Sequence, residues 1–225
     1  MAMTDHFIMK KQTVQIWHCY LPDLFSKETE LFSLLSPDEI ERANRFKFEI
    51  HRQRFIVARA TLRQLLFKYI GIPAKDILFS YGEHGKPFIE NHPIYFNVSH
   101  SHDRAIFAFT LDQEIGIDIE KVENTFKESV AKRFFSEQEF SDLKKMADPI
   151  QNFYQIWAKK EAVIKLFGKG LFMPLENFSV STRKQDEKIQ IESSEIYIKT
   201  IDVGEGYKAA LATFSNINFQ HFEHF

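Results

Sequence analysis

Residues 96–120, FNVSHSHDRAIFAFTLDQEIGIDIE, constrain this chain more than any other stretch. They hold a polar cluster, an apolar strand, a short turn and a second strand that ends in Gly-Ile-Asp-Ile-Glu. Because successive strand side chains point to opposite faces, Ile117 and Ile119 can face a core. Asp118 and Glu120 then share the other face, roughly 7 Å apart. Two carboxylates aimed at one spot could hold Mg²⁺, which completes its shell with water and substrate phosphate, so the stretch raises the question of where a phosphate would bind.

Composition narrows the class of protein. At 225 residues, with 44% hydrophobic residues and 24 phenylalanines, the chain can bury a substantial core as one domain or as two of about 110 residues. The single cysteine, Cys19, excludes an internal disulfide and a Cys-rich zinc site, and it fits a reducing compartment. The short mixed segment around Asp5 and His6 does not resemble a signal peptide, and no apolar run is long enough to span a membrane. We therefore expect a cytoplasmic protein without a membrane partner.

The formal net charge of −2 gives no overall attraction to nucleic acid, but one segment is strongly basic. Between residues 40 and 68, eight cations stand against Glu41 and Glu49, a formal charge of +6. The cations are Arg42, Arg45, Lys47, Arg52, Arg54, Arg59, Arg63 and Lys68. This segment is either a solvated helix face or a docking surface for an anion.

The rest of the chain has a repeated plan. Ser36–Glu39 and Ser136–Glu139 both have the Ser-x-x-Glu form of a capping box, and each precedes a short helix and then a longer helix that ends in glycine. Helices are predicted at about 37–48, 50–70, 125–134, from 137 onward, and 150–167. Strands are predicted at 13–20, 77–81, 94–98, 178–180, 188–191, 196–201 and 207–214. The pattern favours an α+β protein of two similar, pseudo-duplicated halves, 1–112 and 113–225, with a ligand site in the cleft between them.

Each candidate site residue has an ordinary structural reading beside the functional one. Asp118 and Glu120 fit any half-buried strand, and Glu161 with Lys165 fits a common i to i+4 ion pair beside Trp157. The cluster at residues 99–102, Ser-His-Ser-His, fits a phosphate site, a His-x-His zinc site with Asp118 as a third ligand, a nucleophilic serine or a polar hairpin end.

Taken together, these residues are more informative than any one of them. Three carboxylates around one Mg²⁺ leave a formal charge of −1, so a diphosphate would need nearby cations. Lys86, Lys165, His100 and the basic segment supply such cations. This combination is typical of a phosphoryl-transfer site.

Five motifs, in order, resemble those of the 4′-phosphopantetheinyl transferases of the surfactin-synthetase-activating type. They are Gly85-Lys86-Pro87, Phe96-Asn97-Val98-Ser99-His100-Ser101, Gly116-Ile117-Asp118-Ile119-Glu120, Phe134-Phe135-Ser136, and Trp157-x-x-Lys160-Glu161-Ala162-x-x-Lys165-x-x-Gly168-Lys169-Gly170. The resemblance covers about residues 34–214. It implies a monomer of two similar α+β halves that transfers the phosphopantetheine arm of coenzyme A to a serine of an apo acyl or peptidyl carrier protein.

The resemblance also implies a role for each matching position. Asp118, Glu120 and Glu161 would hold Mg²⁺ on the coenzyme A diphosphate, and Lys165 would face that diphosphate. The residues expected to grip phosphates are Lys86, Ser99 and His100, the last on the 3′-phosphate, with Arg42, Arg45 and Arg54 at the adenosine end. Glu39 and Phe55 depart from the family, since at least one member has lysine and threonine there.

The reaction expected from this resemblance is an in-line attack by the carrier serine on the phosphorus that bears the pantetheine arm, releasing adenosine 3′,5′-bisphosphate. Asp118, Glu161 and Lys165 would be the catalytic residues, with Glu161 or a metal-bound water accepting the serine proton. The carrier is expected to dock at residues 121–135. The alternatives are a Mg²⁺-dependent nuclease or phosphoesterase, and a non-catalytic nucleic-acid binder that uses the basic helix.

Overall fold

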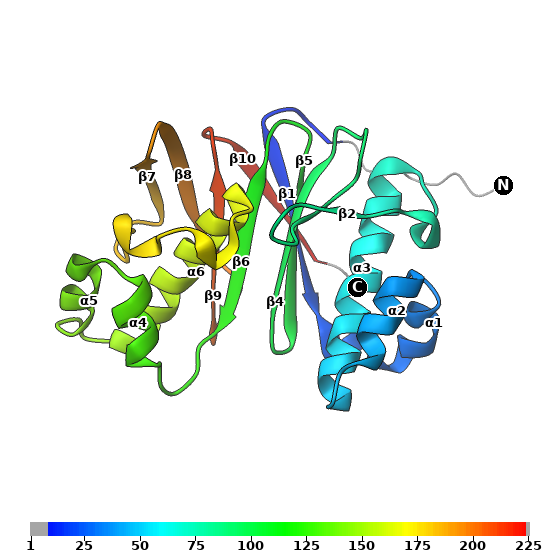
Figure 1. Cartoon of the computed structure of the whole chain (residues 1–225), viewed down its shortest axis with the longest axis horizontal. Helices are drawn as coiled ribbons and strands as arrows, with labels where there is room; N and C mark the ends of the chain where they lie inside the picture. Colours follow the sequence, from blue (N-terminus) through cyan, green and yellow to red (C-terminus); the bar gives the residue numbers. More distant parts are fainter. Residues whose placement is uncertain (1–8, 224–225) are drawn as a thin grey trace.

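The computed structural model describes residues 9–223 and consists of two α+β halves that meet in the middle of the molecule (Figure 1). The predicted α+β class with two similar halves is confirmed. Asp5 and His6, and the outermost ends of the two predicted halves, lie outside the described residues. Across residues 9–223, no helix combines the length and the apolar character that crossing a bilayer requires.

The first half is a four-stranded sheet covered by one long helix, α3 (Glu49–Ile70). The strands, in spatial order, are β10 (Asn218–Glu223), β1 (Thr13–Tyr20), β5 (Arg104–Thr110) and β4 (Tyr95–Ser101). Three short helices lie against α3: η1 (Leu21–Lys27), α1 (Glu28–Phe32) and α2 (Pro37–Asn44). The turn η2 (Ala74–Asp76) and the small hairpin of β2 (Ser80–Tyr81) and β3 (Pro87–Phe88) connect α3 to β4.

The second half repeats this arrangement. Its sheet has the order β6 (Ile115–Lys121), β9 (Tyr207–Thr213), β8 (Ser194–Ile201) and β7 (Asp186–Ile191), and all neighbours are antiparallel. The long helix α6 (Pro149–Phe167) packs across it. The remaining helices are α4 (Glu128–Phe134), α5 (Glu137–Leu143), η3 (Gly170–Phe172) and η4 (Leu175–Asn177).

Three apolar layers follow from the alternation of side chains along the strands. One lies between the first sheet and α3, a second lies between the second sheet and α6, and a third lies between the two sheets (Figure 1). Ile117 and Ile119 of β6 belong to the middle layer, as the sequence predicted. Asp118, which alternates with them, therefore points to the opposite face of β6, toward α6.

The sequence missed β10. This strand pairs in parallel with β1 and places Phe222 in a stacked contact with Trp17, with ring centroids 4.7 Å apart. The last described strand thus belongs to the first sheet. The predicted division between residues 112 and 113 falls in the connection from β5 to β6, and as a domain boundary it stays a prediction.

Several predicted elements differ from the structure. The strand predicted at 77–81 is limited to β2, and the helix predicted from residue 125 begins at Glu128. Helix α2 ends at Asn44 rather than near residue 48, because Phe48 has an extended backbone (φ −110°, ψ 131°) and precedes α3. Residues 178–180 do not form the predicted strand. Their backbone groups bond to side chains instead of to a strand: the Phe178 carbonyl accepts from Lys160 Nζ, and Val180 N donates to Glu139 Oε1.

Candidate active site

The close approach of α6 to β6 positions the candidate carboxylates. A Cβ atom on Gly116 would lie 2.0 Å from the backbone oxygen of Ala162 and 2.3 Å from the backbone nitrogen of Leu166. Only glycine therefore permits this contact. Asp118, two residues further along β6, points to the same face and contacts Lys165 of α6.

Helix α6 supplies Glu161 and Lys165 on one face, as predicted from their spacing. Lys165 Nζ lies 2.7 Å from Asp118 Oδ1 and 2.8 Å from the hydroxyl of Ser99, which itself donates to Asp118 Oδ1 at 2.8 Å. Three residues from three elements, β4, β6 and α6, thus form one partly buried cluster.

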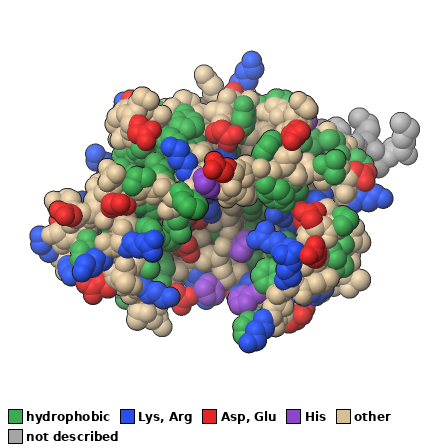
Figure 2. Space-filling view, in the orientation of Figure 1, with side chains coloured by type: hydrophobic (Ala, Val, Ile, Leu, Met, Phe, Trp, Pro, Cys, Tyr) green, Lys and Arg blue, Asp and Glu red, His purple; other side chains and the backbone are tan. Residues whose placement is uncertain are grey.

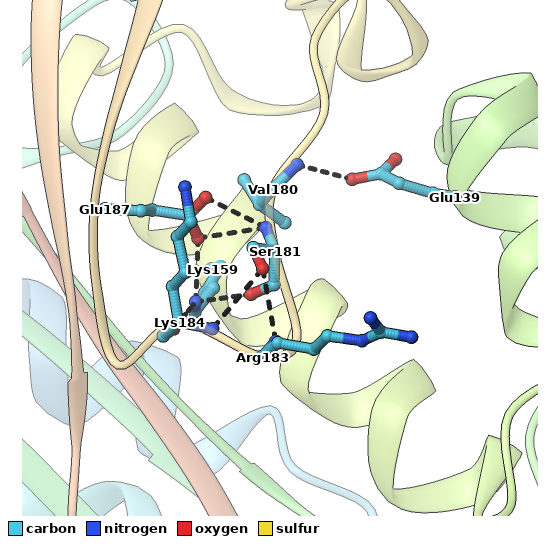
Figure 3. A network of polar contacts seen from close by, with 7 residues as sticks. All are labelled: Glu139, Lys159, Val180, Ser181, Arg183, Lys184 and Glu187. Carbon is cyan, nitrogen blue, oxygen red and sulfur yellow. Dashed lines mark hydrogen bonds and ion pairs between the residues drawn. The ribbon is translucent and has the colours of Figure 1, made fainter.

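The far side of α6 is fixed by two consecutive buried lysines. Lys159 donates to the carbonyls of Ser181 and Lys184 and to Glu187, whose carboxylate also accepts from the backbone of Ser181 (Figure 3). Lys160 donates to the carbonyls of Leu175 and Phe178 and pairs with Glu139 at 2.9 Å. These contacts anchor the segment after α6 to the helix. They also fix the orientation of α6 about its own axis, in which Glu161 and Lys165 face β6.

Asp118 is 3% exposed, and its two oxygens have different surroundings. Oδ1 accepts from Ser99 and Lys165, whereas Oδ2 is buried with no hydrogen-bond partner among the described residues. Burial raises the pKa of this carboxyl, and Lys165 and Ser99 oppose the rise. An orphaned carboxylate oxygen in this position fits a hard cation.

Glu120 and Glu161 are also perturbed. Burial and the neighbouring Asp118 raise the pKa of each to about 7. Glu120 accepts hydrogen bonds from Trp157 Nε1 at 3.2 Å and from Ser101 Oγ at 3.1 Å. The three carboxylates therefore repel one another, and a divalent cation would relieve that repulsion.

Asp118, Glu120 and Glu161 are not preorganised around one point. Within residues 9–223, no three His, Cys, Asp or Glu side chains are arranged so that they could hold a metal ion as they stand. Lys165, and not a histidine, contacts Asp118, which speaks against the His-x-His zinc reading. The oxygen donors suit Mg²⁺ chemically, but side chains must rearrange for all three to bind one ion.

A seam of side-chain hydrogen bonds joins β4 to β6. Alternate residues of β4 reach across it: Asn97 Oδ1 accepts from Ile117 N at 2.9 Å, and Ser101 Oγ accepts from Lys121 N at 3.1 Å. Ser99 lies between them and donates to Asp118. The seam sets the position of the carboxylates of the second half relative to the polar strand of the first.

His100 lies beside the basic segment. Partial desolvation, followed by the positive charges of Lys165, Arg42, Arg54 and Arg59, lowers the pKa of His100 to about 4 in total, although water still reaches the imidazole. Figure 2 shows that this face is hollowed between the two halves and that Lys, Arg and His side chains gather along the border formed by the first half. A concentration of positive potential with a neutral imidazole suits a phosphate.

The other predicted phosphate-binding residues already have partners. Arg54 pairs with Asp103 at 2.6 Å, and Lys86 donates to Glu114 at 2.6 Å and to the carbonyls of Ile115 and Leu166. Arg42 lies over the ring of Phe55, and Arg45 pairs with Glu41 on the surface. Lys86 also lines a cavity of about 620 Å³ whose walls include Tyr95 and Gly168. This cavity lies at the end of the seam away from His100.

Glu39, which departs from the family pattern, has a structural role. It completes the capping box of α2 with Ser36, and its carboxylate lies 2.7 Å from Arg63 and 3.4 Å from Arg59. It is 2% exposed and therefore unable to reach a ligand in the hollow. Phe55, the other departure, is buried against Phe46.

The predicted carrier-docking segment lies beside the carboxylates. A groove of about 380 Å³ runs from Glu120 past Trp157 to Phe126 and Val130. Phe134 packs against Trp157, with ring centroids 5.6 Å apart, and so contributes to the core of the second half.

The sequence assigned no contact to three polar residues, Asn97, Asp103 and Glu114, although Asn97 belongs to the Phe96–Ser101 motif. Asn97 had a detectable signal, because residues 97, 99 and 101 alternate on one face of a strand. Asp103 and Glu114 have no such signal, since their partners, Arg54 and Lys86, lie 49 and 28 residues away. The assignment of catalytic, phosphate-binding and metal-binding roles stays a prediction.

Comparison with known proteins gives consistent matches in both halves. Residues 25–111 match the family model "4′-phosphopantetheinyl transferase, N-terminal", and residues 114–212 match "4′-phosphopantetheinyl transferase superfamily". The chain is 41% identical over 196 residues to 4′-phosphopantetheinyl transferase Sfp of Bacillus subtilis, covering 84% of this chain and 86% of the relative.

Two further relatives carry the same description. The chain is 36% identical over 207 residues to 4′-phosphopantetheinyl transferase ffp of Bacillus subtilis, covering 88% of this chain and 91% of the relative. It is 36% identical over 185 residues to 4′-phosphopantetheinyl transferase HetI of a Nostoc species, covering 79% and 78%.

Proposed function

The chain belongs to the 4′-phosphopantetheinyl transferase family, and we propose that it transfers the 4′-phosphopantetheine arm of coenzyme A to a serine of an apo acyl or peptidyl carrier protein. The second product would be adenosine 3′,5′-bisphosphate. The observation that carries this proposal is the meeting of Asp118, Glu161 and Lys165 with Ser99 at the seam between the two halves.

Magnesium is the proposed cofactor. Asp118, Glu120 and Glu161 would hold it, and the buried, unpartnered Oδ2 of Asp118 supports this choice. When bound, the ion would neutralise charge that develops on the 5′-phosphate of adenosine 3′,5′-bisphosphate as it leaves.

Lys165 and Glu161 have complementary roles in the proposed chemistry. The ammonium of Lys165 would bind the diphosphate and stabilise the charge that the departing adenosine 5′-phosphate gains as the bridging phosphorus–oxygen bond breaks. Burial and Asp118 raise the pKa of Glu161 to about 7 in the metal-free protein, so Glu161 is one candidate to accept the proton of the carrier serine, and a water held by the cation is the other. The attacking hydroxyl would then form the new phosphoester bond to the carrier.

The 3′-phosphate and the adenosine end would bind in the hollow beside His100, with Arg42, Arg45 and Arg54 as cations. Ser99 and Lys86 would contribute donors on the diphosphate side. Arg54 and Lys86 would have to exchange Asp103 and Glu114 for phosphate oxygens, and arginine suits such exchange because its fork binds carboxylate and phosphate alike.

The carrier would dock over residues 121–135, where the groove beside Glu120 offers Phe126 and Val130 next to exposed basic residues of α4. This position would bring the carrier serine to the carboxylates from outside the nucleotide hollow. The apolar groove with a basic rim supports a partner of mixed apolar and acidic surface.

We further propose that the protein is a cytoplasmic monomer that binds neither nucleic acid nor membranes. Several arginines of the basic segment are paired with acids, including Arg52 with Glu28, Arg54 with Asp103 and Arg63 with Glu39. These ion pairs reduce the positive charge that is available to bind the phosphates of a nucleic acid. The buried thiol of Cys19 is compatible with a reducing compartment.

A mass measurement on the carrier tests the function. The protein is incubated with coenzyme A, Mg²⁺ and each member of a panel of apo carriers, and the intact carriers are weighed. We expect a gain of one phosphopantetheinyl group on at least one carrier, lost with EDTA. Asp118→Asn and Glu161→Gln should slow the gain by at least about 100-fold, whereas Glu195→Gln, on the exposed side of β8, should not. No mass gain on any carrier would refute the function.

A further inference from the structure

Lys165 forms an ion pair with Asp118, the buried carboxylate that we propose as a cation ligand. The ammonium lies 2.7 Å from Oδ1, on a carboxylate whose side chain is only 4% exposed, and it also reaches the hydroxyl of Ser99. Both groups that fix the ammonium come from strands, whereas Lys165 itself is 27% exposed at the end of a flexible chain. Of the two partners, the lysine is therefore the one that can move.

The charges around this pair are not balanced. Asp118, Glu120 and Glu161 carry a formal charge of −3, and Lys165 is the cation that contacts Asp118. The ammonium occupies Oδ1, while Oδ2 has no hydrogen-bond partner among the described residues. A divalent cation bound by Asp118 would lie close to the ammonium, and two cations on one buried carboxylate repel each other.

Resting on the proposed function, we propose that Lys165 is an internal counter-cation that holds Asp118 in the ligand-free protein and leaves it for the coenzyme A diphosphate when a divalent ion binds. The lysine thereby opposes metal binding in the absence of nucleotide. The diphosphate gives the ammonium a second anionic partner, so metal and coenzyme A bind cooperatively. No covalent bond changes in this exchange.

Titration of the metal alone tests the exchange. Mg²⁺ and Mn²⁺ are titrated calorimetrically into EDTA-treated protein without coenzyme A or carrier. Lys165→Met should bind both ions at least about tenfold more tightly than wild type. Lys169→Met is the matched control, because it removes an exposed lysine four residues away that does not contact Asp118, and it should stay within about twofold of wild type. Equal or weaker metal binding by Lys165→Met would overturn the proposal.

A second measurement needs no variant. Lysine acetylation by acetic anhydride, read by peptide mass spectrometry, should label Lys165 slowly in the metal-free protein and at least about threefold faster with saturating Mg²⁺, with Lys169 as internal reference. Unchanged labelling under saturating metal would overturn the exchange. Neither readout uses a carrier, so a failure of the exchange is distinct from a failure of the transferase reaction, which only the carrier mass reports.

Discussion

Asp118 shows how neighbouring side chains decide the state of a buried carboxylate. Burial disfavours the ionised form of this carboxyl and thereby raises its pKa. Ser99 and Lys165 each donate to Oδ1 and favour the ionised form. These two donors therefore offset part of the cost of burying the ionised carboxylate.

The raised pKa values of Glu120 and Glu161 predict how stability depends on pH in metal-free protein. Because each pKa rises from 4.5 to about 7 in the folded state, the stabilising effect of the bound protons is complete below pH 4.5 and is lost as pH rises through 7. Glu161→Gln should remove the part of this pH dependence that Glu161 causes. That part is up to about 3 kcal/mol of the decrease in unfolding free energy between pH 5 and pH 8. Urea denaturation in EDTA measures this difference.

Glu137→Gln, on the exposed side of α5, is the control for this experiment and should keep the pH dependence of wild type. If Glu161→Gln lost as much stability between pH 5 and pH 8 as wild type does, Glu161 would not hold a proton in the folded state near pH 6.

Lys160 is the clearest case of a lysine that is structural despite lying next to a candidate catalytic residue. It is fully buried and donates to two carbonyls and to Glu139. Lys160→Met should lower the free energy of unfolding by roughly 3 kcal/mol, because it leaves Glu139 as a buried charge without its partner. In urea denaturation, Lys144→Met, which breaks an exposed ion pair with Glu128, should stay close to wild type. Comparable losses in the two variants would contradict the buried role.

At the scale of elements, the packing of α6 on β6 is the feature that positions the site. Gly116→Ala would place a methyl group 2.0 Å from the backbone of α6, so the helix must shift away and carry Glu161 and Lys165 with it. We expect a loss of at least about 2 kcal/mol in unfolding free energy and a large loss of carrier modification.

Gly82→Ala is a matched control for the Gly116 variant, since its nearest neighbour would lie at 3.7 Å. This variant should retain both stability and carrier modification. A Gly116→Ala protein with wild-type stability and wild-type carrier modification would show that the close packing is not required.

Local signals predicted most elements, and long-range partners account for the misses. Both capping boxes, at Ser36 and Ser136, form as expected because their hydrogen bonds span three residues. Strand β10 could not be inferred in the same way, since its partner β1 lies some 200 residues earlier and its own pattern is short. Residues 178–180 have a strand composition, but Lys160 and Glu139 take their backbone groups.

At the scale of the whole molecule, the site exists only where the two halves meet. Strand alternation paired Asp118 with Glu120, and helical spacing paired Glu161 with Lys165, because both are local properties. Only the combined reading of the motifs and the family resemblance placed the two pairs at one site. It did not show that Asn97, Ser99 and Ser101 bridge β4 to β6, since the two strands are joined by side chains and lack a regular backbone ladder. The seam thus connects β4, which carries the candidate phosphate-binding residues, to β6, which carries the candidate metal-binding carboxylates.

A crystal structure of the protein with coenzyme A and Mn²⁺, with the cation located by anomalous scattering, tests this arrangement most directly. We predict one Mn²⁺ among Asp118, Glu120 and Glu161, in contact with the diphosphate. Lys165 should have moved from Asp118 to a diphosphate oxygen, and the 3′-phosphate should lie beside His100. A cation bound elsewhere, or a diphosphate distant from these carboxylates, would contradict the assignment of the seam as the catalytic site.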